Sequence, residues 1–377
     1  MKNYLCFVFL MAIGASVAQA QRDPAQKEMQ MPICTSTCTG ILGENIFPNG
    51  DFGTGIPNIL PSNPNLAPGF IYQLNPPPND GYYCITNNTG PWGSFAANFW
   101  IDIQDNGPEP NGYMMVVNAT YQPGLFYQKT VDVCENTVYE LSIDIISLIF
   151  THVPNFILPN ISFLIDGNVV CETGNIPQDE QWRTVRFSFV SQPNQNTATF
   201  SLRNNAPGGG GNDLAIDNIS LRACGPGIQV PDTLLFCLGT PLIIPSVLSD
   251  APYNNPVYQW QQFSNGNWTD IPNADNDSLT ISNPTDGSLF RLLVGSAVAN
   301  LALPNCRVVS DPVLLAQRPS PVVSTLSQDV SCAGAANAMA SVQILAGTAP
   351  FLYAWSSGAS SSDLTDLSAG DYSVTVT

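Results

Sequence analysis

The residue types that carry most enzyme chemistry are scarce in this chain. It holds a single histidine, His152, so a Ser–His–Asp triad or a histidine-ligated zinc site would have to use that residue. Nucleophile elbows, phosphate loops and HExxH motifs are absent. Asp179-Glu180 is the best carboxylate pair for glycoside hydrolysis, but adjacent residues on a strand point to opposite faces. We therefore expect no catalysis, with His152 in a structural or surface role and Asp179-Glu180 in a turn before a strand.

Aromatic side chains are dense between residues 70 and 121, where they could bind sugars. A flat ring offers a sugar an apolar platform, and flanking Asn and Asp side chains can fix its hydroxyls. We take Tyr82, Trp92 and Tyr83 as the candidate ligand-binding residues. Other rings must fill a core, and we expect Trp100, Trp260 and Trp355 to be buried.

The elements that would position these residues are short strands. Apolar and polar residues alternate along 141–145, 185–189 and 199–202, which indicates half-buried strands. Asp166-Gly167 predicts a hairpin between Ile161–Ile165 and Val169–Cys171. Gly208–Gly211 lacks a following Lys-Ser/Thr and predicts a loop instead of an anion cradle. With 29 Gly, 32 Pro and no long helical pattern, the chain is predicted to be all-β.

Charge and the first residues favour export. Lys2, the apolar run from Leu5 to Ile13 and Ala18-Gln19-Ala20 predict a signal peptide over residues 1–20. The run is too short to span a membrane, so no membrane insertion of this fragment is expected. The chain has 11 Lys+Arg against 29 Asp+Glu, which argues against nucleic acid and anionic membrane surfaces as partners. Nine of the ten cysteines lie beyond the leader, and scattered cysteines in an exported chain indicate disulfides, with one thiol left over.

Two Pro/Gly-rich breaks divide the mature chain. Residues 21–44 form a tail, residues 45–225 a first region ending at Gly225-Pro226-Gly227, residues 226–317 a second region, and residues 318–377 a third. Cys237, Trp260 and Cys306 occur in the order of an immunoglobulin-type skeleton, so the second region is predicted to be an immunoglobulin-like sandwich with a Cys237–Cys306 disulfide.

The third region resembles the SprB repeat, a module of large surface adhesins of gliding bacteria. The matching residues are 330–334 (VSCAG), Thr348-Ala349-Pro350-Phe351, Tyr353, 355–358 (WSSG) and 367–377 (LSAGDYSVTVT). In that family the last strand continues to a Gly-Cys whose cysteine can pair with the one matching Cys332. The resemblance therefore implies an incomplete repeat, an unpaired Cys332 and a longer protein with downstream modules.

The first region resembles a carbohydrate-binding-module-like jelly roll. The resemblance rests on residues 45–55 (NIFPNGDFGTG) and 211–221 (GNDLAIDNISL). It implies that the terminal strands meet, so that Cys224 pairs with Cys34 or Cys38, and that Ca²⁺ sits between them. Asp51, Asp213 and Asp217 are the candidate metal ligands, although Gly53 stands where the family usually has Glu. The alternative is a turn cap by Asp213 and a buried hydrogen bond from Asp217.

These observations predict tandem β-sandwiches: a jelly roll followed by two immunoglobulin-like modules, the last truncated. The predicted function is a non-catalytic adhesin, secreted or displayed outside the outer membrane, whose jelly roll binds a glycan or surface polysaccharide. One alternative is the targeting region of a secreted enzyme with its catalytic domain downstream. The other is a purely structural surface module.

Overall fold

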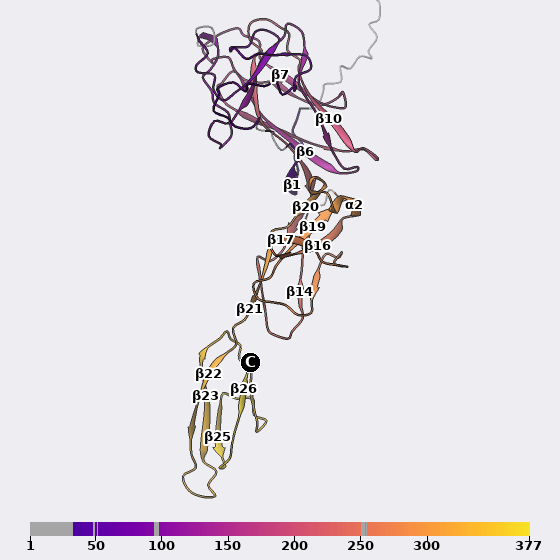
Figure 1. The fold of residues 1–377 in the computed structure, drawn as a ribbon. Helices are drawn as coiled ribbons and strands as arrows, with labels where there is room; N and C mark the ends of the chain where they lie inside the picture. Colours follow the sequence, from indigo (N-terminus) through magenta and orange to yellow (C-terminus); the bar gives the residue numbers. More distant parts are fainter. Residues whose placement is uncertain (1–32, 48–49, 51, 94–97, 250–252, 254) are drawn as a thin grey trace, which may run out of the picture.

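The computed structural model describes residues 33–47, 50, 52–93, 98–249, 253 and 255–377. Three β units follow one another along the chain and form an elongated molecule, with the largest unit at one end (Figure 1). The predicted signal peptide, half of the predicted tail and Asp51 lie outside the described residues. No helix in the described part of the chain is long and apolar enough to cross a membrane.

The first unit is a sandwich of two antiparallel sheets, apart from one parallel pair at an edge. One sheet has the order β2-β3-β4-β11-β6-β9, with β1 also paired to β11, and the other has the order β5-β10-β7-β8. The strands are β1 (Ile41–Asn45), β2 (Ile71–Tyr72), β3 (Tyr82–Thr86), β4 (Met114–Asn118), β5 (Gly124–Asp132), β6 (Val138–Ser147), β7 (Asn160–Ile165), β8 (Asn168–Asn175), β9 (Arg183–Val190), β10 (Thr197–Asn204) and β11 (Leu214–Gly225).

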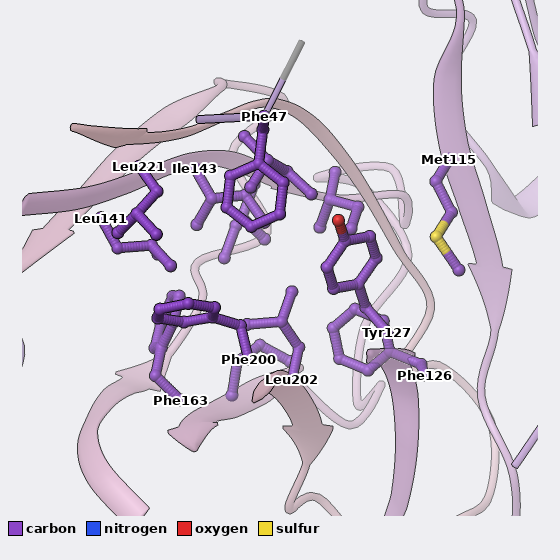
Figure 2. Close-up of a cluster of buried hydrophobic side chains, with 14 of the residues drawn as sticks. Phe47, Met115, Phe126, Tyr127, Leu141, Ile143, Phe163, Phe200, Leu202 and Leu221 are labelled. Atoms are coloured by element: carbon purple, nitrogen blue, oxygen red, sulfur yellow. The ribbon is translucent and has the colours of Figure 1, made fainter. Parts of the chain in front are cut away.

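The strand pattern of the sequence produces the core between these two sheets. Alternate residues of β6, such as Leu141 and Ile143, face Phe163 and Phe200 from the opposite sheet (Figure 2). Asp166 and Gly167 both have positive φ, as a two-residue type I′ turn requires, and they join β7 to β8. The predicted hairpin is therefore confirmed.

Loops cover the other face of the larger sheet. Every residue of β4 is buried, although alternation alone predicts one exposed face. Trp92 and Trp100 lie in these loops and meet edge to face, with ring centroids 6.2 Å apart. Together with Met114, Val116 and Ile146 they form a second, smaller core. The dense aromatics of this region are shared between the two cores, because Trp92 and Trp100 cover the sheet whereas Tyr83 lies in the core between the sheets.

The second unit is a smaller sandwich around Trp260, which is fully buried. Its main sheet has the order β13-β21-β19-β16-β17, with β20 on β19, and two short pairs, β12–β15 and β14–β18, complete it. Its elements are β12 (Gly227–Gln229), β13 (Thr233–Phe236), β14 (Leu242–Ile244), β15 (Val247–Ser249), β16 (Val257–Ser264), β17 (Asn267–Asp270), β18 (Leu279–Ile281), β19 (Leu289–Gly295), α2 (Val298–Leu301), the 3₁₀ turn η1 (Pro304–Cys306), β20 (Arg307–Val309) and β21 (Val313–Gln317).

The third unit has two small sheets, β22-β23-β25 and β24-β26. Its strands are β22 (Val322–Gln328), β23 (Ala338–Ala346), β24 (Tyr353–Trp355), β25 (Asp363–Leu367) and β26 (Val374–Val376). Trp355 is buried with Val342 and Leu364, and Tyr372, Val374 and Val376 pack against them as their alternation predicts. The all-β fold class is thus confirmed in all three units.

Three disulfides fasten the first unit, and one of them corrects a prediction. Cys38 pairs with Cys224, which confirms that Cys224 bonds to Cys34 or Cys38, and Cys34 pairs with Cys171. Cys306 pairs with Cys134 of the first unit, so the predicted Cys237–Cys306 bridge is wrong. Cys237 is an exposed free thiol at the end of β13. Cys306, its predicted partner, lies instead at the junction of the two units, where η1 contacts β1 and β11 of the first unit.

Candidate functional site

Two of the three predicted ligand-binding aromatics are core residues. Tyr83 is 1% exposed and Trp92 is 5% exposed, so neither ring offers a platform to a ligand. Tyr83 packs edge to face on Tyr72 and donates its hydroxyl to Asn63 Oδ1. Tyr82 is half-buried on β3 beside the parallel edge strand β2. Large rings were needed to fill two cores in one unit, which is why the sequence did not distinguish them from a binding surface.

The two predicted metal ligands within the described residues do not fit a shared calcium site. Asp213 and Asp217 are four residues apart on an extended chain, which separates them by roughly 13 Å. Oxygens that bind one calcium ion lie 2.3–2.6 Å from it. Both oxygens of each carboxylate also accept hydrogen bonds from N–H groups, and among the described residues no group of three or more His, Cys, Asp or Glu could hold a metal. The alternative prediction is confirmed for Asp217, which is buried and hydrogen-bonded, whereas Asp213 bonds to Trp100 and Ala119, distant in sequence, instead of capping its own turn.

These two aspartates hold the covering loops onto the larger sheet. Asp213 accepts hydrogen bonds from Trp100 Nε1 at 3.1 Å and from the Ala119 amide at 3.0 Å. Asp217 accepts them from the amides of Asn106, at 2.7 Å, and Asn218, at 2.8 Å. Burial raises the pKa of each carboxyl to about 7, although the hydrogen-bond donors act in the opposite direction and lower the pKa. Their role is therefore structural and sensitive to pH.

The predicted turn at Asp179-Glu180 is also seen. Asp179 pairs with Arg183, which holds the pKa of the Asp179 carboxyl below its ordinary value. Glu180 has a positive φ and accepts hydrogen bonds from the amide and hydroxyl of Thr151. The two carboxylates are thus engaged with different partners. His152 is exposed, with its ring 5.0 Å from that of Phe150.

A polar cleft of about 600 Å³ opens at the end of the smaller sheet. We call it the amide cleft; it is lined by Phe156, Ile157, Leu158, Asn160, Glu172, Asn175, Asn205, Ala206 and Pro207. Asn160 and Asn175 face each other at the end of the β7–β8 hairpin, with Asn160 Nδ2 3.2 Å from Asn175 Oδ1. Asn205 follows β10 and donates through Nδ2 to Asn160 Oδ1 at 3.1 Å. Three amides from three strands therefore meet in one place.

Glu172 completes this polar group. Its Oε1 accepts a hydrogen bond from the Ser162 hydroxyl at 2.9 Å and lies 3.4 Å from Asn205 Nδ2. Its other oxygen, Oε2, makes no hydrogen bond to any residue that the structure describes. The carboxylate is half-buried at the cleft wall. A hydroxyl donor in the cleft would find in Oε2 a fixed acceptor.

A disulfide and backbone hydrogen bonds tie down the surroundings of the amide cleft. Cys34–Cys171 ties the N-terminal segment to β8, one residue before Glu172, and the Cys34 amide donates to the Glu172 carbonyl at 3.0 Å. On the opposite side the glycine run 208–211 forms the predicted loop, with Gly208 donating its amide to the Tyr121 carbonyl. The Phe156 ring lies against this loop, 3.6 Å from where a Gly210 Cβ would be. The polar groups are thus held in place without a ligand.

A second groove of about 430 Å³ crosses the outer face of β11, β6 and β9. We call it the arginine groove; its polar lining residues are Asn45, Glu109, Ser142, Asp144, Thr184, Arg186, Asn218, Ser220 and Arg222. Asp144 is buried in its floor, and its oxygens accept hydrogen bonds from Thr184, Asn106 and Asn218. Ser142 and Ser220 bond to each other at 2.8 Å. The polar groups of the floor are therefore satisfied by one another, and Phe47, the aromatic residue in the lining, is only 4% exposed and offers no platform to a ligand.

The sequence did not single out the residues of the amide cleft. Asn160 opens an Asn-x-Ser motif, Asn160-Ile161-Ser162, which indicates no binding site by itself, and Glu172 and Asn175 lie beyond the short strand predicted after the Asp166-Gly167 turn. Their convergence depends on two register shifts in the β7–β8 pairing. A regular hairpin would place Cys171 opposite Ser162, whereas the structure places Glu172 there.

Comparisons with known proteins identify one family in the chain. Residues 324–360 match the SprB repeat, so the third unit carries the repeat that its sequence resembles. No curated protein matches the chain. Similar solved structures include a sugar-binding protein, the EclA C-terminal domain, at 17% identity over 28% of this chain and 80% of that one, with a TM-score of 0.22. An amphioxus IgVJ-C2 molecule is similar at 12% identity over 38% of this chain and 98% of that one, with a TM-score of 0.17. A marsupial T cell receptor is similar at 10% identity over 66% of this chain and 96% of that one, with a TM-score of 0.21.

Proposed function

We propose that this protein is a non-catalytic modular adhesin, exported to the cell surface, whose first unit binds a neutral glycan in the amide cleft. The second and third units act as spacers that carry this head outward. The SprB repeat and the elongated arrangement of the three units support a surface adhesin (Figure 1). The ligand is assigned to the first unit, as expected from the sequence. The proposed binding site is the amide cleft instead of the predicted aromatic residues, two of which are buried.

The observation that carries the proposal is the chemistry of the amide cleft. Amide groups both donate and accept hydrogen bonds, as sugar hydroxyls do, and Glu172 adds a fixed acceptor. The half-buried ring of Phe156 supplies an apolar wall. A volume of about 600 Å³ falls within the range of small-molecule sites. Because the cleft carries one acidic and no basic side chain, it favours neutral over acidic sugars.

The test is a glycan array probed with the mature chain, residues 21–377, followed by titration of the neutral glycans that bind. Asn175→Ala removes an exposed side-chain amide whose one hydrogen bond among the residues that the structure describes is to Asn160, so the fold should survive. Glu172→Gln keeps the shape of the side chain and removes its charge. Each variant should weaken binding about tenfold, since one hydrogen bond is worth about 1–1.5 kcal/mol.

Arg186→Ala is the matched control, because Arg186 is an exposed residue of the arginine groove on the other sheet. Its affinity for the same glycans should equal that of the unaltered chain. Binding that survives both cleft variants and disappears with Arg186→Ala would overturn the assignment of the site. A folded chain that binds no neutral glycan on the array would overturn the proposed function itself.

A further inference from the structure

The junction between the first and second units is bonded and buried. Cys134 follows β5 of the first unit and Cys306 ends η1 of the second, and the two cysteines are 6% and 0% exposed. Their sequence separation is 172 residues. The disulfide therefore joins the two units covalently a second time, in addition to the peptide link between them at Gly225-Pro226-Gly227.

Polar contacts surround this disulfide. The Tyr139 hydroxyl, fully buried, accepts a hydrogen bond from the Cys134 amide at 2.8 Å. Asn300 Nδ2 donates to Thr137 Oγ1 across the junction at 3.2 Å, and Ser296 Oγ lies 3.2 Å from the same hydroxyl. Ile41 of β1 packs against the core of the second unit. The two units are therefore in direct contact, and the disulfide lies inside that contact.

A second disulfide, within the first unit, lies beside the peptide link to the second unit. Cys38–Cys224 ties the last strand of the first unit to its N-terminal segment, directly before the link to β12. The segment from Cys224 to Cys306 is thus bonded to the first unit at both ends. It contains most of the second unit, from β12 to η1. Only β20 and β21 lie between Cys306 and the linker to the third unit.

We propose that Cys134–Cys306 makes the second unit a force-shielded joint, which bears tension between the first unit and the rest of the chain without extending. A pull from the third unit reaches Cys306 after β20 and β21 and then passes through the disulfide into the first unit. The disulfide connects Cys306 to the first unit by a shorter path than the backbone from Cys224 to Cys306, so that stretch of backbone carries no tension. This inference concerns mechanics and holds whichever ligand the first unit binds.

The size of the effect follows from the sequence positions. If β20 and β21 are pulled away, the oxidised joint releases the eleven residues from 307 to 317. At about 3.5 Å per residue they add about 40 Å of chain. Without the disulfide, unfolding of the second unit releases the 92 residues from 226 to 317, or about 320 Å. The disulfide therefore changes the extension of this unit about eightfold.

Single-molecule force spectroscopy on the mature chain tests the proposal, with handles attached at both ends by chemistry that avoids thiols. Unaltered protein should show a step of about 40 Å for the second unit. The variant Cys134→Ser/Cys306→Ser should show about 320 Å instead. Cys34→Ser/Cys171→Ser removes a disulfide within the first unit alone, so the second unit should keep its short step.

Two further measurements keep the proposal falsifiable if the double serine variant fails to fold. Unaltered protein held under load and then exposed to a reductant should convert from the short step to the long one. Peptide mapping without reduction should recover Cys134 linked to Cys306. A long step in the oxidised, unaltered protein, or a peptide linking Cys306 to Cys237, would overturn the inference while leaving the proposed glycan site untouched.

Discussion

Replacing Trp100 with phenylalanine tests how the covering loops are held on the larger sheet. Trp100 is 1% exposed, and its Nε1 donates to Asp213 Oδ2 at 3.1 Å. The variant keeps an aromatic ring and removes the donor. Asp213 then retains the Ala119 amide as its other donor among the hydrogen bonds described above. The loss of free energy should depend on whether the Asp213 carboxyl is charged.

The magnitude follows from the pKa of Asp213. Burial raises this pKa from 3.8 in the unfolded chain to about 7 in the fold, so the folded state binds the proton more tightly. The unaltered unit therefore loses stability as pH rises from about 4 to 7, by at most about 4 kcal/mol from this group. A hydrogen bond to a charged group is worth about 1.5–3 kcal/mol, and one to a neutral group about 0.5–1.5 kcal/mol. Trp100→Phe should therefore cost roughly 1–2 kcal/mol more at pH 8 than at pH 5, beyond a pH-independent cost of the smaller ring.

The assay is hydrogen exchange of peptides from β4 and β11 at both pH values, which reports the opening of this unit separately from the other two. In the double variant Trp100→Phe/Asp213→Asn the carboxyl is gone, so the extra cost at pH 8 should disappear. An equal loss of opening free energy at pH 5 and pH 8 for Trp100→Phe would refute the reasoning. It would mean that the indole stabilises the loops by packing alone.

Two other predictions concern thiols and glycines. Cys237 and Cys332 are exposed free thiols, whereas Cys84 is fully buried and its burial raises the pKa of its thiol. A maleimide should therefore label two cysteines in the native mature chain, and a third only after unfolding without reduction. A single native label would contradict the assignment of Cys237. Gly208→Ala would place a Cβ 1.9 Å from Tyr121 Cα, so it should destabilise the loop beside the amide cleft by about 1–3 kcal/mol and lower the melting temperature of the first unit. In Gly210→Ala the new Cβ meets only the Phe156 ring, at 3.6 Å, so this variant should leave the melting temperature of the first unit unchanged. Equal melting temperatures for the two glycine variants would contradict this contact.

Much of the fold could be predicted because its determinants are local. Alternation along residues 141–145, 185–189 and 199–202 depends only on the two-residue period of a strand, and strands β6, β9 and β10 form there, although β6 is buried on both faces and not half-buried. The Asp166-Gly167 turn depends on the positive φ that these two residues tolerate. Burial of Trp100, Trp260 and Trp355 follows from the size of the rings and the few large side chains available to fill each core.

The candidate site could not be predicted in the same way. Tyr83 and Trp92 are the residue types of a sugar platform, but the sequence does not say that Tyr83 fills the core between the sheets or that Trp92 fills a second core under loops that cover the outer face of β4. The β7–β8 register shifts decide that Glu172, not Cys171, stands beside Ser162 and faces the cleft. A shift of one residue exchanges the two faces of a strand, and nothing local to the sequence specifies it.

The pairing of the cysteines shows most clearly which features the sequence determined and which only the tertiary structure decided. The sequence by itself determined an all-β chain with disulfides, because composition and strand period are properties of short segments. Only the tertiary structure decided that Cys306 bonds to Cys134 of another unit and leaves Cys237 free. The order Cys, Trp, Cys within one unit suggested an internal bridge. Which thiols meet depends on how two folded units contact each other, and a disulfide forms only between cysteines whose Cα atoms come within about 7 Å.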